Sequence, residues 1–185
     1  ALCATYASAD GDFAAQVRTI EQRREQAFAD GYCSEFNPAI HAWLAGLYAV
    51  LEKGLVLLID YGYPAKEYYL EERNSGTLVC HYQHRAHADP LWYPGLQDIT
   101  AFVDFTAVAH AAVDAGFGVS GYTSQAMFLL GCGLAELHQT LMSDDPRQQL
   151  LLAQQVKTLT LPSEMGERFK AIALTRGMDV PLIGF

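Results

Sequence analysis

A run of five apolar residues, Leu55 to Ile59, constrains the fold more than any other feature of this sequence. A half-exposed strand alternates apolar and polar residues, whereas a run that is apolar at every position is typical of a strand covered by helices on both faces of a parallel sheet. The run ends at Asp60-Tyr61-Gly62. We therefore expect a buried parallel strand that stops at a carboxylate and an aromatic ring.

Helices are predicted before and after this strand. Asn37 suits a helix cap and Pro38 the first helical position, and bulky apolar residues recur at helical spacing as far as Leu51. Asp104 suits the cap of a second helix, which Gly116 ends. Similar signals predict a strand pair within residues 1–20 around Asp10-Gly11, a solvated helix over Thr19–Ala29, a strand over Phe117–Thr123, a helix from Ser124 through Leu137, a helix from Pro146 to before Pro162, and a strand over Phe169–Thr175.

Helices that alternate with apolar strands are typical of an α/β fold with an open sheet. Only two or three good strands are found, although a doubly wound domain usually has about five or more around its ligand crevice. The sheet is therefore unusually small, or part of it is missing. No repeat or low-complexity linker divides the chain, so residues 1–185 are predicted to form one domain. The absence of a G-x-G-x-x-G turn removes the usual place for a nucleotide-like cofactor.

Charge and composition exclude several classes of partner and site. The formal net charge is −9, so unspecific attraction to nucleic acid or to an anionic membrane is weak. No apolar run approaches the roughly 20 residues that a bilayer crossing needs. The four cysteines are scattered without a C-x-x-C pair, which favours free thiols in a reducing compartment over disulfides. Together these features predict a soluble, cytoplasmic protein that does not insert into membranes or bind nucleic acid.

The segment over residues 62–97 is the most distinctive part of the chain. It has no convincing helix or strand pattern, and in a compact domain so long a segment is usually functional or disordered. Its aromatic residues argue against disorder; they are Tyr63, Tyr68, Tyr69, Tyr82, Trp92 and Tyr93. We expect the segment to fold over the carboxyl end of the Leu55 strand, where open α/β sheets bind ligands, and to form the substrate side of the domain.

Four side chains in this segment raise the question of a metal site: His81, His84, His87 and Asp89. If the stretch were helical, His81 and His84 would share one face as two imidazole ligands for zinc. The spacing matches no recognised catalytic metal signature such as H-E-x-x-H. Loop imidazoles that hydrogen-bond to backbone or solvent are the simpler interpretation.

Acid–base or substrate-orienting chemistry is the other interpretation. It places Asp60 and Tyr61 at the strand end, with Tyr82, His84 and Asp98 folded back onto them. Asp60 also suits a simpler role, because a carboxylate after a strand often accepts hydrogen bonds from the backbone amides of the following turn. Asp98, like Asp104, has the same simpler role as a cap.

Several longer motifs follow one another in unbroken order. They are Gly54 to Gly62, Thr77-Leu78 to His84, Pro94-Gly95 to Ala101, Val103-Asp104-Phe105-Thr106, Ser124-Gln125 to Leu130, and Glu164 to Lys170. From about Tyr32 to Phe185 the chain resembles the MidA-like family of S-adenosylmethionine-dependent methyltransferases. Mitochondrial members of that family methylate an arginine on a respiratory complex I subunit during its assembly.

The resemblance implies a Rossmann-like class I methyltransferase core with S-adenosyl-L-methionine as cofactor. The family's cofactor-binding elements lie in an amino-terminal half that has no counterpart here, so no cofactor-binding residue is assigned in this chain. The chain then corresponds to the carboxyl-terminal portion of a methyltransferase domain, with part of the sheet missing. The implied partner is a protein substrate, such as a respiratory-complex subunit, and a eukaryotic member would be mitochondrial.

The resemblance also suggests roles for the candidate site residues. For an arginine acceptor, Asp60 and Asp98 are natural groups to hold the guanidinium by paired hydrogen bonds, and Tyr61, Tyr82 and His84 would wall the pocket. The acidic net charge would attract a basic substrate. One departure from the family is Phe102, which stands where many bacterial members have histidine and so removes one proton carrier.

Two other functions stay open. The chain is a noncatalytic interaction module if its aromatic segment docks a partner protein and the cofactor site is lost. It is a metal-dependent hydrolase if the His81 to Asp89 cluster binds zinc or a similar ion. Cofactor binding separates the first from a methyltransferase, and metal content separates the second.

Overall fold

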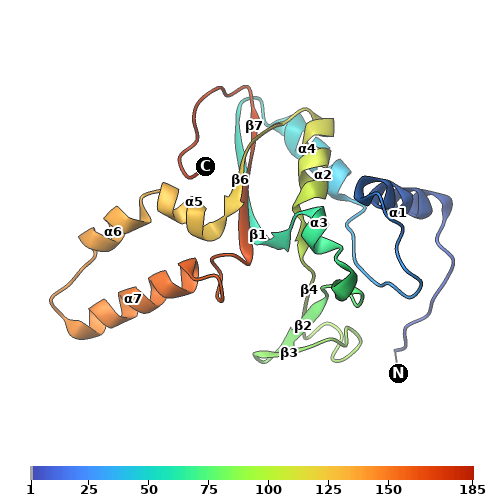
Figure 1. Cartoon of the computed structure of the whole chain (residues 1–185), viewed down its shortest axis with the longest axis horizontal. Coiled ribbons are helices and arrows are strands. Elements are labelled where there is room, and N and C mark those ends of the chain that lie inside the picture. The colour runs from blue at the N-terminus through green and yellow to red at the C-terminus, as the bar shows by residue number, and fades with distance from the viewer. Residues whose placement is uncertain (1) are drawn as a thin grey trace.

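The computed structural model describes residues 2–185 and shows an α/β fold around a mixed four-stranded sheet with the order β5-β1-β7-β6 (Figure 1). Helices α2 and α4 lie on one side of this sheet, and α5 leads from the other side into an arm formed by α6 and α7. The elements are, in chain order, α1 (Gly11–Arg24), α2 (Ile40–Val50), β1 (Gly54–Tyr63), α3 (Ala65–Tyr68), η1 (Glu71–Arg73), β2 (Val79–Tyr82), β3 (Arg85–His87), β4 (Asp98–Thr100), β5 (Val103–Asp104), α4 (Phe105–Ala115), β6 (Gly118–Ser124), α5 (Gln125–Gly131), α6 (Leu134–Thr140), α7 (Pro146–Thr160) and β7 (Phe169–Arg176).

The hydrophobic core fills the space between the sheet and the pair α2–α4. Leu44 of α2, Val108 of α4 and Leu174 of β7 are almost completely buried there. Burial of a side chain of this size contributes about 1.5–3 kcal/mol, so this layer holds α2 and α4 against the sheet. The predicted helices over these residues are confirmed, and so are the strands over Phe117–Thr123 and Phe169–Thr175.

The predicted boundaries of α4 and α7 follow their capping residues, but the predicted start of α2 is wrong: α2 begins at Ile40 rather than Pro38, and Asn37 closes the preceding turn by accepting a hydrogen bond from the Ala39 amide at 3.0 Å. The Asp104 carboxylate accepts hydrogen bonds from the Thr106 and Ala107 amides at 2.9 and 3.0 Å, and Gly116 ends α4 with a φ of 106°. Asp145 caps α7 in the same way, with Pro146 in its first turn.

β1 is paired differently from the prediction. It runs antiparallel to β7 over Gly54–Tyr61 and parallel to β5 only through Gly62 and Tyr63. Its side chains alternate between faces: Val56 and Leu58 pack against the core, whereas Leu55, Leu57 and Ile59 are 41, 39 and 43% exposed. The prediction of a strand covered on both faces of a parallel sheet is therefore wrong, because the face opposite α2 and α4 is left open.

The outer edge of β1 is also open. Within residues 2–185, no strand pairs with the side of β1 opposite β7 between Gly54 and Tyr61. An unpaired edge presents backbone donors and acceptors that another strand can use. The predicted shortage of strands is thus visible as an unpaired edge at one side of the sheet.

The predicted strand pair within residues 1–20 does not form, and the predicted helix over Thr19–Ala29 has the wrong boundaries. Residues 11–24 form the single helix α1, since the Asp10 carboxylate caps it by accepting a hydrogen bond from the Phe13 amide at 2.7 Å. The Asp10-Gly11 pair suits a hairpin turn, but it serves here as the cap and the first helical residue. None of the residues of α1 is buried, as expected of a solvated helix.

The helix predicted from Ser124 through Leu137 is broken in two. The Ser124 hydroxyl caps α5, but Gly133 takes a φ of 87°, which ends the first helical segment and starts α6.

Residues 62–97 contain more regular structure than the sequence predicts. A second, three-stranded sheet with the order β3-β2-β4 forms from this segment and the residues that follow it. β2 and β3 are joined by the two-residue turn Gln83-His84, in which both residues have positive φ. The small sheet lies beyond the carboxyl end of β1 (Figure 1), which is the end that the segment was expected to cover.

Candidate functional site

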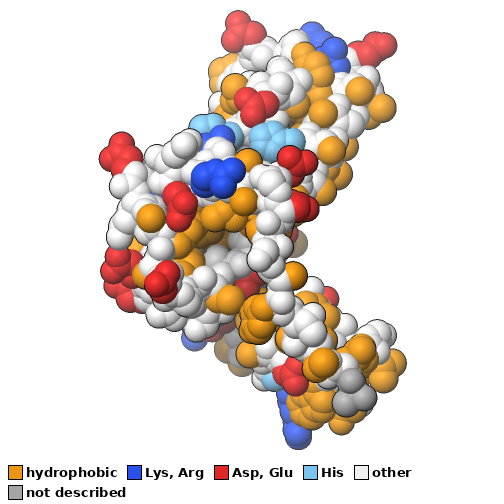
Figure 2. All heavy atoms as spheres, turned by 90° about the vertical axis from the view of Figure 1, so that its right-hand side faces the viewer, with side chains coloured by type: hydrophobic (Ala, Val, Ile, Leu, Met, Phe, Trp, Pro, Cys, Tyr) orange, Lys and Arg blue, Asp and Glu red, His pale blue; other side chains and the backbone are white. Residues whose placement is uncertain are grey.

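A cavity of about 950 Å³ lies beside the carboxyl half of β1. Its walls come from one face of α1, the segment that leads into α2, residues 57–60 of β1, α3, and the start of α4. On the face shown in Figure 2 the molecule is hollowed, hydrophobic side chains line the hollow, and acidic side chains stand around it. The cavity therefore lies at the end of the sheet where α/β folds bind ligands.

The cavity carries more negative than positive charge. The charged residues that line it are Arg23, Glu35, Asp60 and Asp104, which give a net charge of −2 when His41 is neutral. Six aromatic residues also line it: Phe36, Trp43, Tyr68, Tyr69, Phe102 and Phe105. Carboxylates and ring faces both attract cations, so the cavity suits a positively charged ligand with an apolar stem.

Asp60 lines this cavity as an exposed residue of β1. One carboxylate oxygen, Oδ1, accepts a hydrogen bond from the Tyr61 amide at 2.8 Å. The local backbone contact expected of the simpler role is therefore present, and the second oxygen makes no hydrogen bond within the described chain. The substrate-orienting role of Asp60 stays a prediction, for which its place in the cavity wall is the relevant observation.

Asp104 lines the cavity at a more enclosed position. Burial raises the pKa of its carboxyl above the ordinary value, while the Ala107 and Thr106 amides that it caps lower it. Both amides donate to the same carboxylate oxygen, Oδ1. The sequence predicted Asp104 only as a cap.

A network of hydrogen bonds around Glu35 shapes one wall of the cavity. The Glu35 carboxylate accepts hydrogen bonds from the Thr77 amide at 2.8 Å, the Thr77 hydroxyl at 3.0 Å and the Leu78 amide at 3.2 Å. The Tyr68 hydroxyl donates to the backbone carbonyls of Phe102 and Glu35, at 3.1 and 3.3 Å. These bonds join four segments that are distant in the sequence, so they fix the cavity wall.

The other predicted site residues lie outside the cavity. The Tyr61 ring packs against Phe102 and Phe169, with ring centroids 5.3 and 5.4 Å apart. Tyr82 stacks on Tyr93 in the small sheet at 4.6 Å. His84 occupies the exposed β2–β3 turn with a φ of 64°, and Asp98 faces His81 across the pair β2–β4. The structure thus brings Asp60 to the cavity and places Tyr82, His84 and Asp98 together on a separate sheet.

Glu35, Tyr69 and Asp104 are cavity residues that the sequence did not single out as functional. In the sequence, Tyr69 stands out only as an aromatic residue and Asp104 only as a helix cap. The signal available for Asp104 is its place at the end of the short strand β5. This strand lies beside β1, because Val103 pairs with Gly62.

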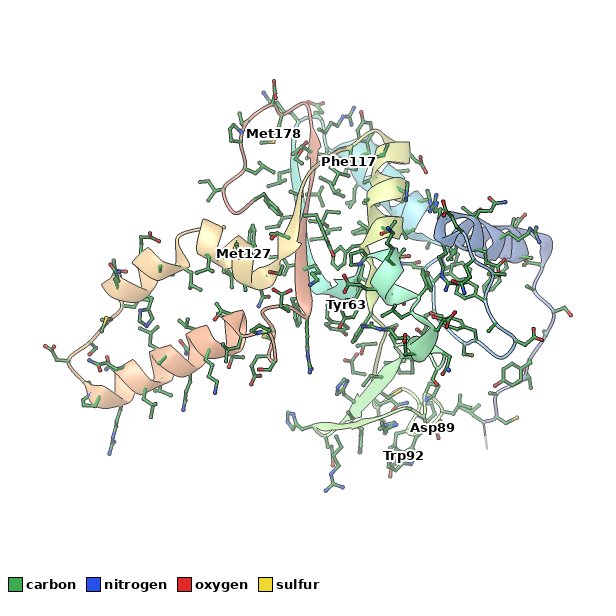
Figure 3. The ribbon with its side chains drawn as sticks, in the orientation of Figure 1. Tyr63, Asp89, Trp92, Phe117, Met127 and Met178 are labelled. Carbon is green, nitrogen blue, oxygen red and sulfur yellow. The ribbon has the colours of Figure 1, made fainter. Side chains whose placement is uncertain are left out.

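The helical face proposed for a metal site does not form. His81 lies in β2, His84 in the turn and His87 in β3, so the two imidazoles do not share a helix face. Across residues 2–185, no group of three or more His, Cys, Asp or Glu side chains is close enough together to hold a metal ion. Figure 3 shows Asp89 and Trp92 in the loop beside the small sheet, apart from Tyr63 at the end of β1.

Comparison with protein families gives a match over residues 4–123. The matching family is described as "Putative S-adenosyl-L-methionine-dependent methyltransferase". The match includes α1, β1, the small sheet and α4, which together form the cavity and its surroundings.

Curated relatives extend the match to nearly the whole chain. The "Protein arginine methyltransferase NDUFAF7 homolog, mitochondrial" of Drosophila melanogaster is 30% identical over 97% of this chain. The "Protein arginine methyltransferase NDUFAF7, mitochondrial" of Danio rerio is 33% identical over 63% of it. This chain covers 44% of the Drosophila protein and 26% of the zebrafish protein, so it spans less than half the length of these relatives.

Two solved structures from Burkholderia thailandensis have the same fold. One, a "likely methyl transferase" bound to S-adenosyl-homocysteine, is 43% identical, with a TM-score of 0.88 over 98% of this chain and 46% of its own. The other, described as uncharacterised, is 45% identical, with a TM-score of 0.83 over 91% of this chain and 46% of its own. This chain therefore has the same fold as a little under half of each of these two longer proteins.

Proposed function

Because the chain belongs to the family of putative S-adenosyl-L-methionine-dependent methyltransferases, we propose that it is the acceptor-side, carboxyl-terminal part of a protein methyltransferase domain. The observation that carries this proposal is the acidic, aromatic cavity at the carboxyl end of β1. It lies within a fold that matches a protein bound to S-adenosyl-homocysteine at a TM-score of 0.88. Residues 62–97 are then the substrate-side segment.

The open edge of β1 supports the proposal of a partial domain. Residues 57–59 both line the cavity and belong to the strand edge that lacks a partner within the described residues. A strand added at this edge would complete the sheet and close one side of the cavity. The relatives, which are about twice as long, provide a segment from which such a strand would come.

The cavity fits part of a methyl-transfer site better than a whole cofactor site. Its carboxylates and aromatic rings suit a cation, but the sequence contains no glycine-rich turn of the kind that cradles a nucleotide-like cofactor. S-adenosylmethionine, when bound, supplies an activated methyl group on a sulfonium. We propose that its principal contacts come from the part of the relatives that this chain does not match.

The residues of this chain bind and orient the acceptor. An arginine acceptor, named for the relatives, needs carboxylates that accept from its guanidinium and an apolar wall that removes water from the reacting nitrogen. Asp60 and the aromatic wall meet these needs. Correct positioning of the acceptor contributes much of the rate in such a transfer, since the donor is already activated. Tyr61, Tyr82, His84 and Asp98 are proposed as an outer part of the same acceptor site, reached across the small sheet.

A protein substrate is the partner that this reaction requires. A subunit of a respiratory complex, which the family resemblance suggests, is the first acceptor to test. The Drosophila relative is named as mitochondrial, which supports a mitochondrial location if the protein is eukaryotic; for a bacterial protein we propose a cytoplasmic location. No helix within residues 2–185 is long and apolar enough to cross a bilayer.

The test compares two proteins by calorimetric titration with S-adenosylmethionine: the 185-residue chain, and a protein of the relatives' length that contains it. We expect only the longer protein to bind the cofactor and to transfer a labelled methyl group to arginine peptides. If neither protein binds the cofactor, the methyltransferase proposal is wrong.

An interaction module is the second candidate, and one observation favours it. The rings of Tyr82, Tyr93 and Trp92 form a continuous stack with centroid separations of 4.6 and 4.8 Å, and Trp92 is 50% exposed. Exposed aromatic rings are enriched at protein interfaces. This candidate is supported if neither the 185-residue chain nor the longer protein binds the cofactor, and if Trp92→Ala abolishes binding of a partner protein.

A further inference from the structure

The segment after β7, residues 177–185, turns back and ends beside α5, on the side of the sheet that α2 and α4 leave uncovered (Figure 1). Within residues 2–185, no backbone hydrogen bond joins residues 178–185 to the rest of the chain. Val180 and Ile183 are 58 and 77% exposed, whereas Gly184 is buried. The segment is therefore held on the fold chiefly by packing at its end, around Gly184 and Phe185.

Gly184 and Phe185 occupy a seat that exists only because two positions are glycine. A Cβ atom on Gly131, at the end of α5, would lie 2.9 Å from the Gly184 Cα, and one on Gly121 of β6 would overlap the Phe185 ring. The Phe185 ring also packs against the Phe128 ring of α5, with centroids 5.2 Å apart. Gly121, Phe128 and Gly131 thus form the seat, and a larger side chain at either glycine would displace the segment.

The seat lies at the base of the arm formed by α6 and α7. Gly131 ends α5, and two residues later Gly133 takes a φ of 87° and starts α6. Neither α6 nor α7 has a buried residue, so neither helix is fixed by a core of its own. The direction of α6 therefore depends on how firmly the end of α5 is held.

The two ends of α5 are held in different ways. At its start, the buried Gln125 side chain donates a hydrogen bond to the Leu159 carbonyl at 3.0 Å, and the Ala126 amide donates to the Gly166 carbonyl at 3.0 Å. At its other end, the packing of Gly184 and Phe185 takes this place. Segments with few buried contacts open locally before the rest of a fold, so the end of α5 at the seat is the end that can be released.

We propose that residues 178–185 are a strap: seated, they fix the direction of α6, and unseated, they let α6 swing about Gly133. Glycine suits this hinge, because its backbone adopts positive φ without steric cost. The inference goes beyond the proposed function, because neither the strap nor α6 lines the cavity.

Double electron–electron resonance on the 185-residue chain measures the direction of α6 relative to α4. Spin labels are placed on two exposed residues, one in each helix, by Gln139→Cys and Val113→Cys. The exposed cysteines are replaced by serine and the buried Cys80 stays; they are Cys3, Cys33 and Cys132. Singly labelled protein gives the background from any association between copies.

Phe185→Ala empties the seat. The distance distribution between the labels should become at least about twofold wider, because α6 has no buried residue to fix it otherwise. Ile183→Ala is the matched control within the strap, since Ile183 is 77% exposed and lies outside the seat. It should leave the distribution unchanged.

Gly131→Ala tests the seat from the side of the helix. The added Cβ should push Gly184 out and widen the distribution, although alanine favours a helix more than glycine does. Gly46→Ala in α2 is the matched control, because a Cβ there meets no atom within 4 Å. It should have no effect on the distribution.

Far-ultraviolet circular dichroism separates release of the strap from unfolding. The helical signal should stay the same in Phe185→Ala and Gly131→Ala, because the core between the sheet and the pair α2–α4 includes no residue of the strap. The proposal is overturned if the distribution stays unchanged in both variants, or if Ile183→Ala widens it as much as Phe185→Ala. Widening that occurs only together with a loss of helical signal would overturn it as well.

Discussion

At the scale of single residues, the Tyr68 hydroxyl links the segments around Glu35, Thr77 and Phe102. Tyr68 is 2% exposed, and its hydroxyl donates to the carbonyls of Phe102 and Glu35 and lies 3.4 Å from the Thr77 hydroxyl. We expect Tyr68→Phe to lower the free energy of unfolding by about 1–3 kcal/mol, because buried polar groups lose their partner. Urea unfolding at pH 7 measures this, with the 94% exposed Tyr6 as a control in Tyr6→Phe.

The same substitution changes the response to alkaline pH. Burial raises the pKa of Tyr68 to about 12, whereas the unfolded side chain titrates near its ordinary value of 10.0. The contribution of Tyr68 to stability is therefore fully present below pH 10 and is lost as the pH rises from 10 to about 12. Tyr68→Phe should make the decline in this window shallower without removing it, because the pKa of Tyr122 is also raised to about 12. An identical slope in both proteins would contradict the buried, protonated hydroxyl.

Single residues also show what a sequence can and cannot reveal about the site. Asp60 was predicted from its place at the end of an apolar run, and it does line the cavity. Asp104 and Tyr69 were not, because their cavity positions depend on the pairing of Val103 with Gly62 and on the turn from β1 into α3. Such long-range pairings leave no periodic signal in the chain.

At the scale of secondary-structure elements, capped helices were predicted well and the small sheet was not. Caps and helical periodicity are local, so α2, α4 and α7 follow from neighbouring residues. The β2–β3 hairpin was missed because its turn, Gln83-His84, lacks the Asn-Gly or Asp-Gly pair that normally marks such turns. Its strands are only four and three residues long, too short for a period of two to be recognised.

This turn gives a prediction at the same scale. Gln83 and His84 have φ values of 47° and 64°, a backbone region that glycine adopts without steric cost. If His84 has only a structural role, His84→Gly should stabilise the small sheet by about 1 kcal/mol. The near-ultraviolet circular dichroism of the Tyr82–Tyr93–Trp92 stack during thermal unfolding reports on this sheet. His84→Ala removes the imidazole but keeps the Cβ, so it should give no such gain; equal stabilisation by both changes would show that backbone strain is not the cause.

At the scale of the whole molecule, the open edge of β1 decides how the isolated chain behaves. The edge opposite β7 is unpaired from Gly54 to Tyr61 within residues 2–185, and Leu55 on the uncovered face is 41% exposed. Exposed apolar edges pair with other chains, and lysine on such strands prevents this. We therefore expect the 185-residue chain to self-associate and Leu55→Lys to shift it toward monomer, as measured by sedimentation velocity.

The same substitution should act in the opposite direction once the edge is covered. In a protein of the relatives' length, a strand added beside β1 would bury Leu55, so Leu55→Lys should lower the free energy of unfolding by several kcal/mol, since an unpaired charge is then buried. Val113→Lys is the matched control, because Val113 is 58% exposed on α4 and away from the sheet edge. It should change neither association nor stability by more than about 0.5 kcal/mol. If Leu55→Lys is harmless in the longer protein, the added segment packs elsewhere and the sheet of this chain is complete with the four strands it has.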